Sequence, residues 1–139
     1  MKSFRKELWI VYPEKQGIQN ITKDVKECLT LSGIQDGLCL VSSTNVTSSI
    51  FTNSDESEMH INFLEWLEKI APHDPDEKEK IGERELAYLD THLKRALVGR
   101  DIVIAVTKSE LEMGTWEQIL YVEFDGKRRK HVLVKIIGE

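Results

Sequence analysis

The four histidines of the chain are the first residues that could do acid–base chemistry, because imidazole changes charge near neutral pH. His60 and His92 each lie in a segment with a helical pattern, and Asp90 stands two residues before His92. A histidine beside a carboxylate is a frequent general acid or base. We predict that His92, His60 and Asp90 are catalytic and that the two histidines meet in one cleft; the alternative is that they are ordinary surface or core residues. His73, in a charged loop, is expected to be solvated, and His131 to be structural.

Two other stretches have the side chains to bind an anion. Residues 42–52 include seven Ser or Thr, whose hydroxyls, together with the N–H groups of a turn, can hold a phosphate. The alternative is a half-exposed strand, in which Ser and Thr are common. Residues 127–130 read Lys-Arg-Arg-Lys. If that turn faces a cleft, Arg128 or Arg129 can hold a phosphate through a two-pronged contact; otherwise the turn is solvated.

Composition excludes several classes of protein. The chain has 139 residues and a formal net charge of -5, which disfavours binding to a nucleic-acid backbone. No apolar run approaches the roughly 18 residues of a membrane span, and the N-terminal residues have no signal-peptide core, so we expect a soluble cytoplasmic protein that binds no membrane. The spacing of Cys28 and Cys39 fits no metal-ligand pair, and both are predicted to be buried, reduced thiols.

The spacing of apolar residues predicts the elements that must position these groups. Strands are predicted over residues 4–12, 38–41, 46–52, 102–106, 116–124 and 131–137, with a short strand at Ile18. Residues 38–41 and 46–52 are either two strands or one long bent strand. A first helix begins near Thr22, which caps it, and ends at Gly33, which permits a left-handed exit. A second helix covers residues 56–71, and its apolar stripe consists of Met59, Phe63, Trp66, Leu67 and Ile70. A third covers residues 83–97, with Leu86, Leu89, Leu93 and Leu97 facing inward.

The order of these elements predicts the fold class. Residues 73–82 are polar and charged and read as one long loop, and Asp125-Gly126 between the last two strands predicts a β-hairpin. Strands and helices that do not strictly alternate predict one α+β domain over residues 1–139, with mixed or antiparallel β-sheets packed against two or three helices. The continuous apolar strands at residues 102–106 and 132–137 need cover on more than one face, which a neighbouring copy can provide.

Three segments together resemble one protein family. They are MGTWEQILYVEFDGKRRKHVLVKIIGE at residues 113–139, HLKRALVGRDIVIAVT at residues 92–107, and LCLVSSTNVTSSIFTNSDESEMHINFLEWLEKIAP at residues 38–72. In order and content they are similar to the YjbQ-like secondary thiamine-phosphate synthase family, and the likeness covers almost the whole chain.

The resemblance implies a trimer-forming YjbQ-like fold with sites near subunit boundaries. It also implies a transferase that joins a pyrimidine diphosphate to a thiazole phosphate, a reaction in which diphosphate must be stabilised as a leaving group. His92, Asp90 and His60 match family positions, which supports the catalytic assignment. By the same likeness the ligand- or phosphate-binding residues are predicted to be Asn45, Thr47, Ser49, Trp116, Arg128 and Arg129.

The sequence also departs from the family pattern. Asn45 stands where the family usually has a histidine, Ile61 and Asn62 replace a usual His and Asp, and Tyr88 replaces a usual Asn. The family's Tyr-x-His-Asn segment has no counterpart in residues 76–86. Because amide and apolar side chains are poor ligands for a transition metal, we assign no metal-binding residue and leave the cofactor open. The expected function is a weak or altered transferase; the alternative is a non-catalytic trimer that binds a phosphorylated or anionic metabolite.

Overall fold

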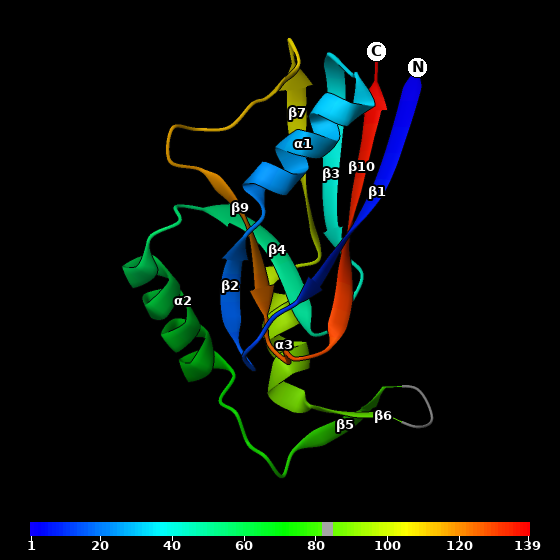
Figure 1. Ribbon diagram of the computed structural model, residues 1–139. Helices are drawn as coiled ribbons and strands as arrows, with labels where there is room; N and C mark the ends of the chain where they lie inside the picture. Colours follow the sequence, from blue (N-terminus) through cyan, green and yellow to red (C-terminus); the bar gives the residue numbers. More distant parts are fainter. Residues whose placement is uncertain (82–84) are drawn as a thin grey trace.

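The computed structural model describes the backbone of residues 1–81 and 85–139 and the side chains of residues 1–78 and 87–139. Within these residues the chain forms three helices and ten strands, and all the strand pairs are antiparallel (Figure 1). The helices are α1 (Thr22–Ser32), α2 (Ser57–Ile70) and α3 (Leu89–Val98). The strands are β1 (Lys2–Val11), β2 (Gly17–Asn20), β3 (Asp36–Ser43), β4 (Ser48–Asn53), β5 (Lys78–Ile81), β6 (Glu85–Tyr88), β7 (Asp101–Thr107), β8 (Glu110–Leu111), β9 (Gln118–Glu123) and β10 (Arg129–Gly138). The predicted α+β class is confirmed.

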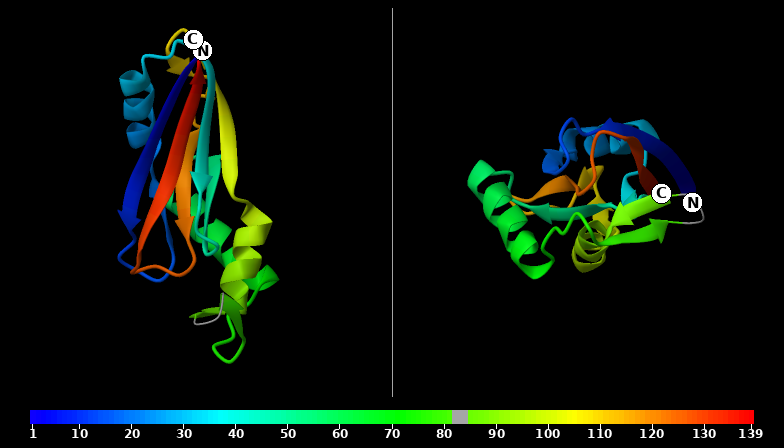
Figure 2. Two further views of the ribbon diagram at one scale, coloured as in Figure 1. Left: turned by 90° about the vertical axis from the view of Figure 1, so that its right-hand side faces the viewer. Right: turned by 90° about the horizontal axis from the view of Figure 1, so that it is seen from below.

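The larger sheet has the strand order β1-β10-β3-β7-β8 and curls around the core (Figure 2). Alternate residues of a strand point to the same face of a sheet, and in this sheet the residues that point inward are apolar. On β10 the inward residues Val132, Val134 and Ile136 are fully buried. The outer face also carries apolar side chains, and Leu38, Val103 and Ile137 on it are 37% to 59% exposed. Both ends of the chain lie at one end of this sheet (Figure 1).

The smaller sheet has the order β2-β9-β4 and lies between the two parts of the core. Residues 119–124 of β9 and the loop after it are all buried, because both faces of the strand are covered. Ile119 and Tyr121 face the large core cluster, whereas Val122 and Phe124 face α2 and its residue Leu67. The predicted hairpin of residues 116–124 and 131–137 is therefore wrong. β9 pairs with β2 and β4, and β10 pairs with β1 and β3, so the turn between them crosses from one sheet to the other.

The first two helices agree with the prediction in extent but differ in detail. The cap predicted at Thr22 is wrong: the N-cap residue of α1 is Ile21, and the Asn20 side-chain oxygen instead accepts a hydrogen bond from the Thr22 N–H at 2.9 Å. Gly33 has the predicted left-handed conformation, with φ of 68°. In α2 the buried stripe is narrower than predicted, because Leu67 is buried while Trp66 and Ile70 are about half exposed.

The third helix is the largest correction. α3 begins at Leu89, because residues 85–88 form strand β6 and pair with β5, which itself occupies part of the predicted 73–82 loop. Glu83 and the side chain of Leu86, which the prediction placed in this helix, lie outside the described residues. The inward face is polar: Asp90, Thr91 and Lys94 are buried, whereas the leucines at 93 and 97 are 48% and 51% exposed. The apolar spacing misassigned the face because an ion pair lies on the buried side.

Within the described residues, the helices are too short and too polar for any of them to cross a bilayer.

Candidate functional site

A buried lysine–aspartate pair anchors the candidate site at the N-terminal end of α3. Lys94 Nζ lies 2.8 Å from Asp90 Oδ2, one helical turn away, and 3.1 Å from Glu68 Oε2 on α2. The Asp90 and Lys94 side chains are 2% and 1% exposed. Charges removed from water need partners, and here each has at least one. The pair therefore fixes α3 against the end of α2.

His73 connects this pair to the surface. Its backbone N–H donates to Glu68 Oε1 at 3.0 Å, which fixes the residue after the end of α2. The ring places Nδ1 at 2.9 Å from Asp90 Oδ1 and Nε2 at 3.3 Å from Lys15 Nζ. An ammonium group can only donate, so Nε2 accepts and the ring proton lies on Nδ1, where it is donated to Asp90. The expectation that His73 is merely solvated is wrong, because 27% of its side chain is exposed and both ring nitrogens have protein partners.

Two lysine ammonium groups lie over the ring of Tyr88, beside this histidine. The Tyr88 ring packs edge-on to His73 with centroids 4.7 Å apart. Lys15 Nζ and Lys78 Nζ lie 4.4 and 5.2 Å from the centroid of the same ring, within the range of cation–π contacts. Among the described side chains, no carboxylate forms an ion pair with Lys15 or Lys78. We call Lys15, Glu68, His73, Lys78, Tyr88, Asp90 and Lys94 the His73 cluster.

The electrostatics of the cluster keep Asp90 ionised. Burial by itself would raise the pKa of the Asp90 carboxyl, but hydrogen bonds from Lys94 and His73, together with their charges, outweigh burial and lower it. The carboxylate is thus a fixed acceptor that holds the imidazole in one orientation and one tautomer. The basic lone pair of Nε2 then points toward the partly exposed side of the cluster, where Lys15 lies.

A second buried network joins the two sheets. Lys130 Nζ donates to Glu123 Oε2, to Thr47 Oγ1 at 2.9 Å and to the Asp125 carbonyl at 2.7 Å. Tyr121 Oη donates to the other Glu123 oxygen at 2.5 Å. Burial, with the charge of Glu123 and their hydrogen bond, raises the pKa of Tyr121. All three protons of the lysine are used, so this network is a structural link. It also corrects the view of residues 127–130 as one exposed basic turn, because Lys130 is 5% exposed.

The predicted hydroxyl groups around β4 are occupied within the protein. Thr47 Oγ1 donates to Asn45 Oδ1 at 2.6 Å, and the Thr47 N–H donates to the same oxygen. Ser49 Oγ donates to the Arg95 carbonyl at 3.4 Å. Arg95 in turn donates to the carbonyl oxygens of Ser43 and Ser48. These contacts hold α3 on the corner between β3 and β4, and ligand binding by Asn45, Thr47 and Ser49 stays a prediction.

The predicted catalytic residues do not form one group. Asp90 belongs to the His73 cluster, but His92, two residues further along α3, points about 200° away from it around the helix. His60 lies in the first turn of α2, with Nε2 2.9 Å from Asp55 Oδ1. It is about 12 Å along α2 from Glu68, the α2 residue that reaches the cluster. The spacing of two between Asp90 and His92 already places them on different sides of one helix, whereas the distance of His60 from the cluster depends on the tertiary structure.

The remaining predicted ligand residues lie elsewhere on the surface. Trp116 is 78% exposed in the segment before β9. Arg128 pairs with Asp125 at 3.1 Å, whereas the Arg129 guanidinium lies 4.1 Å from the centroid of the Trp9 ring. The His131 ring packs against the same Trp9 indole, with centroids 4.9 Å apart, which agrees with a structural role. The two arginines therefore face different partners.

Sequence reasoning missed Lys15, Glu68 and His73. They lie in a strand-connecting loop, at the end of a helix and in a polar loop, and no spacing links them. One available signal was the spacing of four between Asp90 and Lys94, which places opposite charges on one side of a helix.

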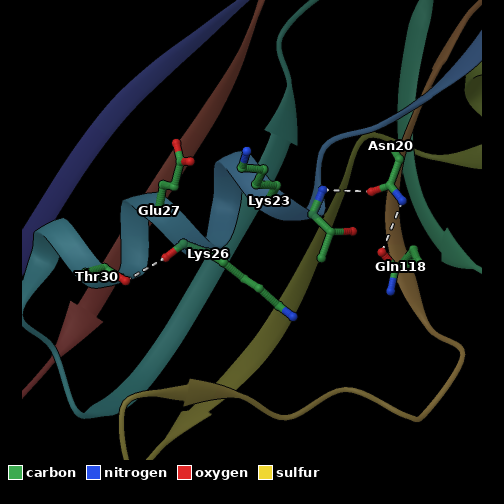
Figure 3. A pocket seen from close by; sticks show the side chains of 7 residues that line it. Asn20, Lys23, Lys26, Glu27, Thr30 and Gln118 are labelled. Atoms are coloured by element: carbon green, nitrogen blue, oxygen red, sulfur yellow. Dashed lines mark hydrogen bonds between the residues drawn. The ribbon is translucent and has the colours of Figure 1, made fainter.

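One surface groove lies apart from this cluster. A groove of about 470 Å³ runs along α1 and is lined by Asn20, Thr22, Lys23, Lys26, Glu27, Thr30 and Gln118 (Figure 3). Asn20 bridges the Thr22 N–H and the Gln118 side chain there. The charged side chains of this groove, Lys23, Lys26 and Glu27, are all exposed. We therefore place the candidate site by its chemistry, at the His73 cluster.

The donor set of the cluster does not fit a divalent metal. The position between the Asp90 and Glu68 carboxylates, where a cation would bind, is taken by the Lys94 ammonium group. Within the part of the chain that is described, His, Cys, Asp and Glu side chains form no group of three or more suited to a metal ion. We therefore derive no step that uses one.

The described residues define a class: an α+β protein in which two curled antiparallel sheets and a small two-stranded sheet pack with three helices. Residues 6–139 match the family described as UPF0047 protein, YjbQ-like. The chain belongs to this family.

Relatives support the assignment over nearly full length. A UPF0047 protein of Archaeoglobus fulgidus is 34% identical over 131 residues, covering 94% of this chain and 99% of that protein. The UPF0047 protein YugU of Bacillus subtilis is 27% identical, covering 96% and 98%. A crystal structure of a YbjQ-like protein of unknown function from Sulfolobus solfataricus superposes with a TM-score of 0.87 at 27% identity, covering 99% of both chains.

Proposed function

We propose that this protein binds a small phosphorylated metabolite at the His73 cluster. The observation that carries the proposal is the position of Lys15 and Lys78, whose ammonium groups lie on the Tyr88 ring beside the partly exposed His73. Phosphate oxygens accept hydrogen bonds from ammonium groups, and charge-assisted bonds of this kind are about twice as strong as neutral ones. Lys94 and Lys130 are unsuited to this role, because buried carboxylates already neutralise them.

A binding experiment with matched lysine variants tests this proposal. The full chain is titrated by calorimetry with inorganic pyrophosphate, with a pyrimidine diphosphate and with a thiazole phosphate. We expect Lys15→Gln and Lys78→Gln each to weaken binding by about tenfold, which corresponds to one charge-assisted contact. Lys2→Gln, with the same charge change at the exposed start of β1, should leave affinity unchanged. Equal affinity in all three variants would place the site elsewhere.

We propose further that binding supports the transferase reaction that the family resemblance implies. Both substrates of that reaction, the pyrimidine diphosphate and the thiazole phosphate, are phosphorylated. Asp90, predicted as catalytic from its match to the family pattern, lies in the same cluster as the two lysines. Formation of thiamine phosphate by the purified protein, lost in Asp90→Asn, would support catalysis at this cluster. Binding without turnover would leave a non-catalytic metabolite-binding protein.

We also propose that the protein acts as a homotrimer. The outer face of the larger sheet supports this assembly: Leu38, Val103 and Ile137 lie on adjacent strands there and are substantially exposed. Sheets with apolar residues on both faces are normally covered on both. A second and third copy of the chain are the occupants we propose, and the solution mass tests this.

A further inference from the structure

We propose that His73 Nε2 accepts a phosphoryl group, so that the His73 cluster is a phosphohistidine site. The inference rests on the proposed function, because the same Lys15 and Lys78 ammonium groups would hold the phosphoryl oxygens. It goes further by assigning a covalent step and one atom to carry it.

The hydrogen bonds of His73 prepare Nε2 as a nucleophile. An imidazole attacks through the nitrogen that carries no proton, and the 3.3 Å contact with Lys15 Nζ identifies that nitrogen as Nε2. Asp90 Oδ1 accepts a hydrogen bond from the opposite ring nitrogen, Nδ1, at 2.9 Å, and the other Asp90 oxygen pairs with Lys94 Nζ at 2.8 Å. A buried carboxylate that orients a nucleophilic or basic imidazole is a recurring catalytic arrangement.

Access and charge complete the site. The His73 side chain is 27% exposed, whereas Asp90 is almost completely buried. A phosphoryl donor in solution can therefore reach the imidazole ring but not the carboxylate. Lys15 lies in the loop between β1 and β2 and is only partly buried. Its ammonium group can therefore pass from the ring nitrogen to a phosphoryl oxygen when the N–P bond forms. Lys78, on the same Tyr88 ring, supplies a second positive charge.

The step balances with a phosphoryl donor as co-reactant, here phosphoramidate. The lone pair of Nε2 forms the N–P bond with phosphoramidate whose nitrogen is already protonated. The P–N bond of that molecule breaks, and neutral ammonia leaves with the electron pair and with the proton that the nitrogen already carried. The proton on Nδ1 remains on the ring, and the Asp90 carboxylate balances the positive charge that the ring acquires. No electron is lost or gained, so no oxidant or reductant is needed.

The full-length chain is incubated with phosphoramidate at neutral pH, and labelled sites are identified by ³¹P NMR and by peptide mass under alkaline conditions, where phosphohistidine persists. We expect His73 to be labelled at Nε2, at least about tenfold faster than His60, His92 or His131, because its ring is held between a buried carboxylate and a lysine. His73→Gln should abolish the fast signal, and His131→Gln should retain it.

Three outcomes would overturn the inference: equal labelling of all four histidines, labelling of His73 at Nδ1, or an unchanged signal in His73→Gln. Lys15→Gln provides a variant outside the buried pair, and it should slow labelling by about tenfold without unfolding the chain. The pyrophosphate titration distinguishes failure of the proposed function from failure of this inference. Loss of pyrophosphate binding with His73 still labelled would remove the proposed function alone, and binding without labelling would remove this inference alone.

Discussion

Lys130 on β10 and Glu123 on β9 form an ion pair whose side chains are 3% and 0% exposed, and it joins the five-stranded sheet to the three-stranded sheet. β9 and β10 are adjacent in sequence but belong to different sheets. The pair thus lies at the point where the chain crosses from one sheet to the other. Thr47 and Tyr121 complete its hydrogen bonds, so each charged group is satisfied inside the protein.

The first prediction concerns this ion pair. Lys130→Met should lower the free energy of unfolding by about 3–5 kcal/mol, because it leaves the Glu123 carboxylate buried without a counter-charge. Urea unfolding measures the change. The double variant Lys130→Met/Glu123→Gln should recover part of the loss. Arg128→Met, which removes a surface pair, should cost no more than about 1 kcal/mol, and equal losses in both single variants would contradict the role given to Lys130.

The second prediction concerns pH and Asp90. Its pKa is lowered in the folded protein, so Asp90 contributes stability that is present above its unfolded pKa of about 3.9 and is lost as pH falls through the folded value. The difference in unfolding free energy between the natural chain and Asp90→Asn should therefore be constant near neutral pH and shrink below about pH 4. Asp36→Asn, at the exposed start of β3, is the control, and a difference that grows on acidification would refute the assignment.

The third prediction concerns the two cysteines. Burial raises the pKa of both thiols, and burial with the nearby Cys28 raises the pKa of Cys39 to about 12. The thiolate is the reactive form, so neither cysteine should react quickly with a thiol reagent in the native protein at pH 8. Both should react within minutes in denaturant. Rapid reaction of one thiol in the native state would show an opening that the packed core does not provide.

The fourth prediction compares two glycines. A Cβ added at Gly37 would lie 2.0 Å from the Ile137 carbonyl oxygen, so Gly37→Ala must separate β3 from β10 at their ends. Gly33 has φ of 68° with nothing within 4 Å of an added Cβ, so Gly33→Ala should cost about 1–2 kcal/mol through backbone strain alone. Thermal unfolding should show the larger loss for Gly37→Ala. A smaller loss there would mean that the strand ends separate readily.

The fifth prediction concerns assembly. The natural chain should have the solution mass of a trimer, and Val103→Glu should dissociate it, because a carboxylate would then be buried on the outer face of the larger sheet. Leu31→Glu, on α1 and 67% exposed, is the matched control and should remain trimeric. Light scattering coupled to gel filtration gives both masses. A monomeric natural chain would contradict the proposed assembly.

The sequence by itself determined the α+β class, the extents of α1 and α2, and the burial of both cysteines, because each depends on apolar spacing or on local turn chemistry. It also carried the resemblance that membership of the UPF0047, YjbQ-like family confirms. The partners of β9 and the contacts of His73 were decided only by tertiary structure. An Asp-Gly turn between two apolar strands looks the same whether the strands pair or enter different sheets, because pairing depends on which other strands lie alongside. Likewise, Lys15, His73 and Asp90 meet through three separate segments, and no local spacing records a contact between residues 58 positions apart.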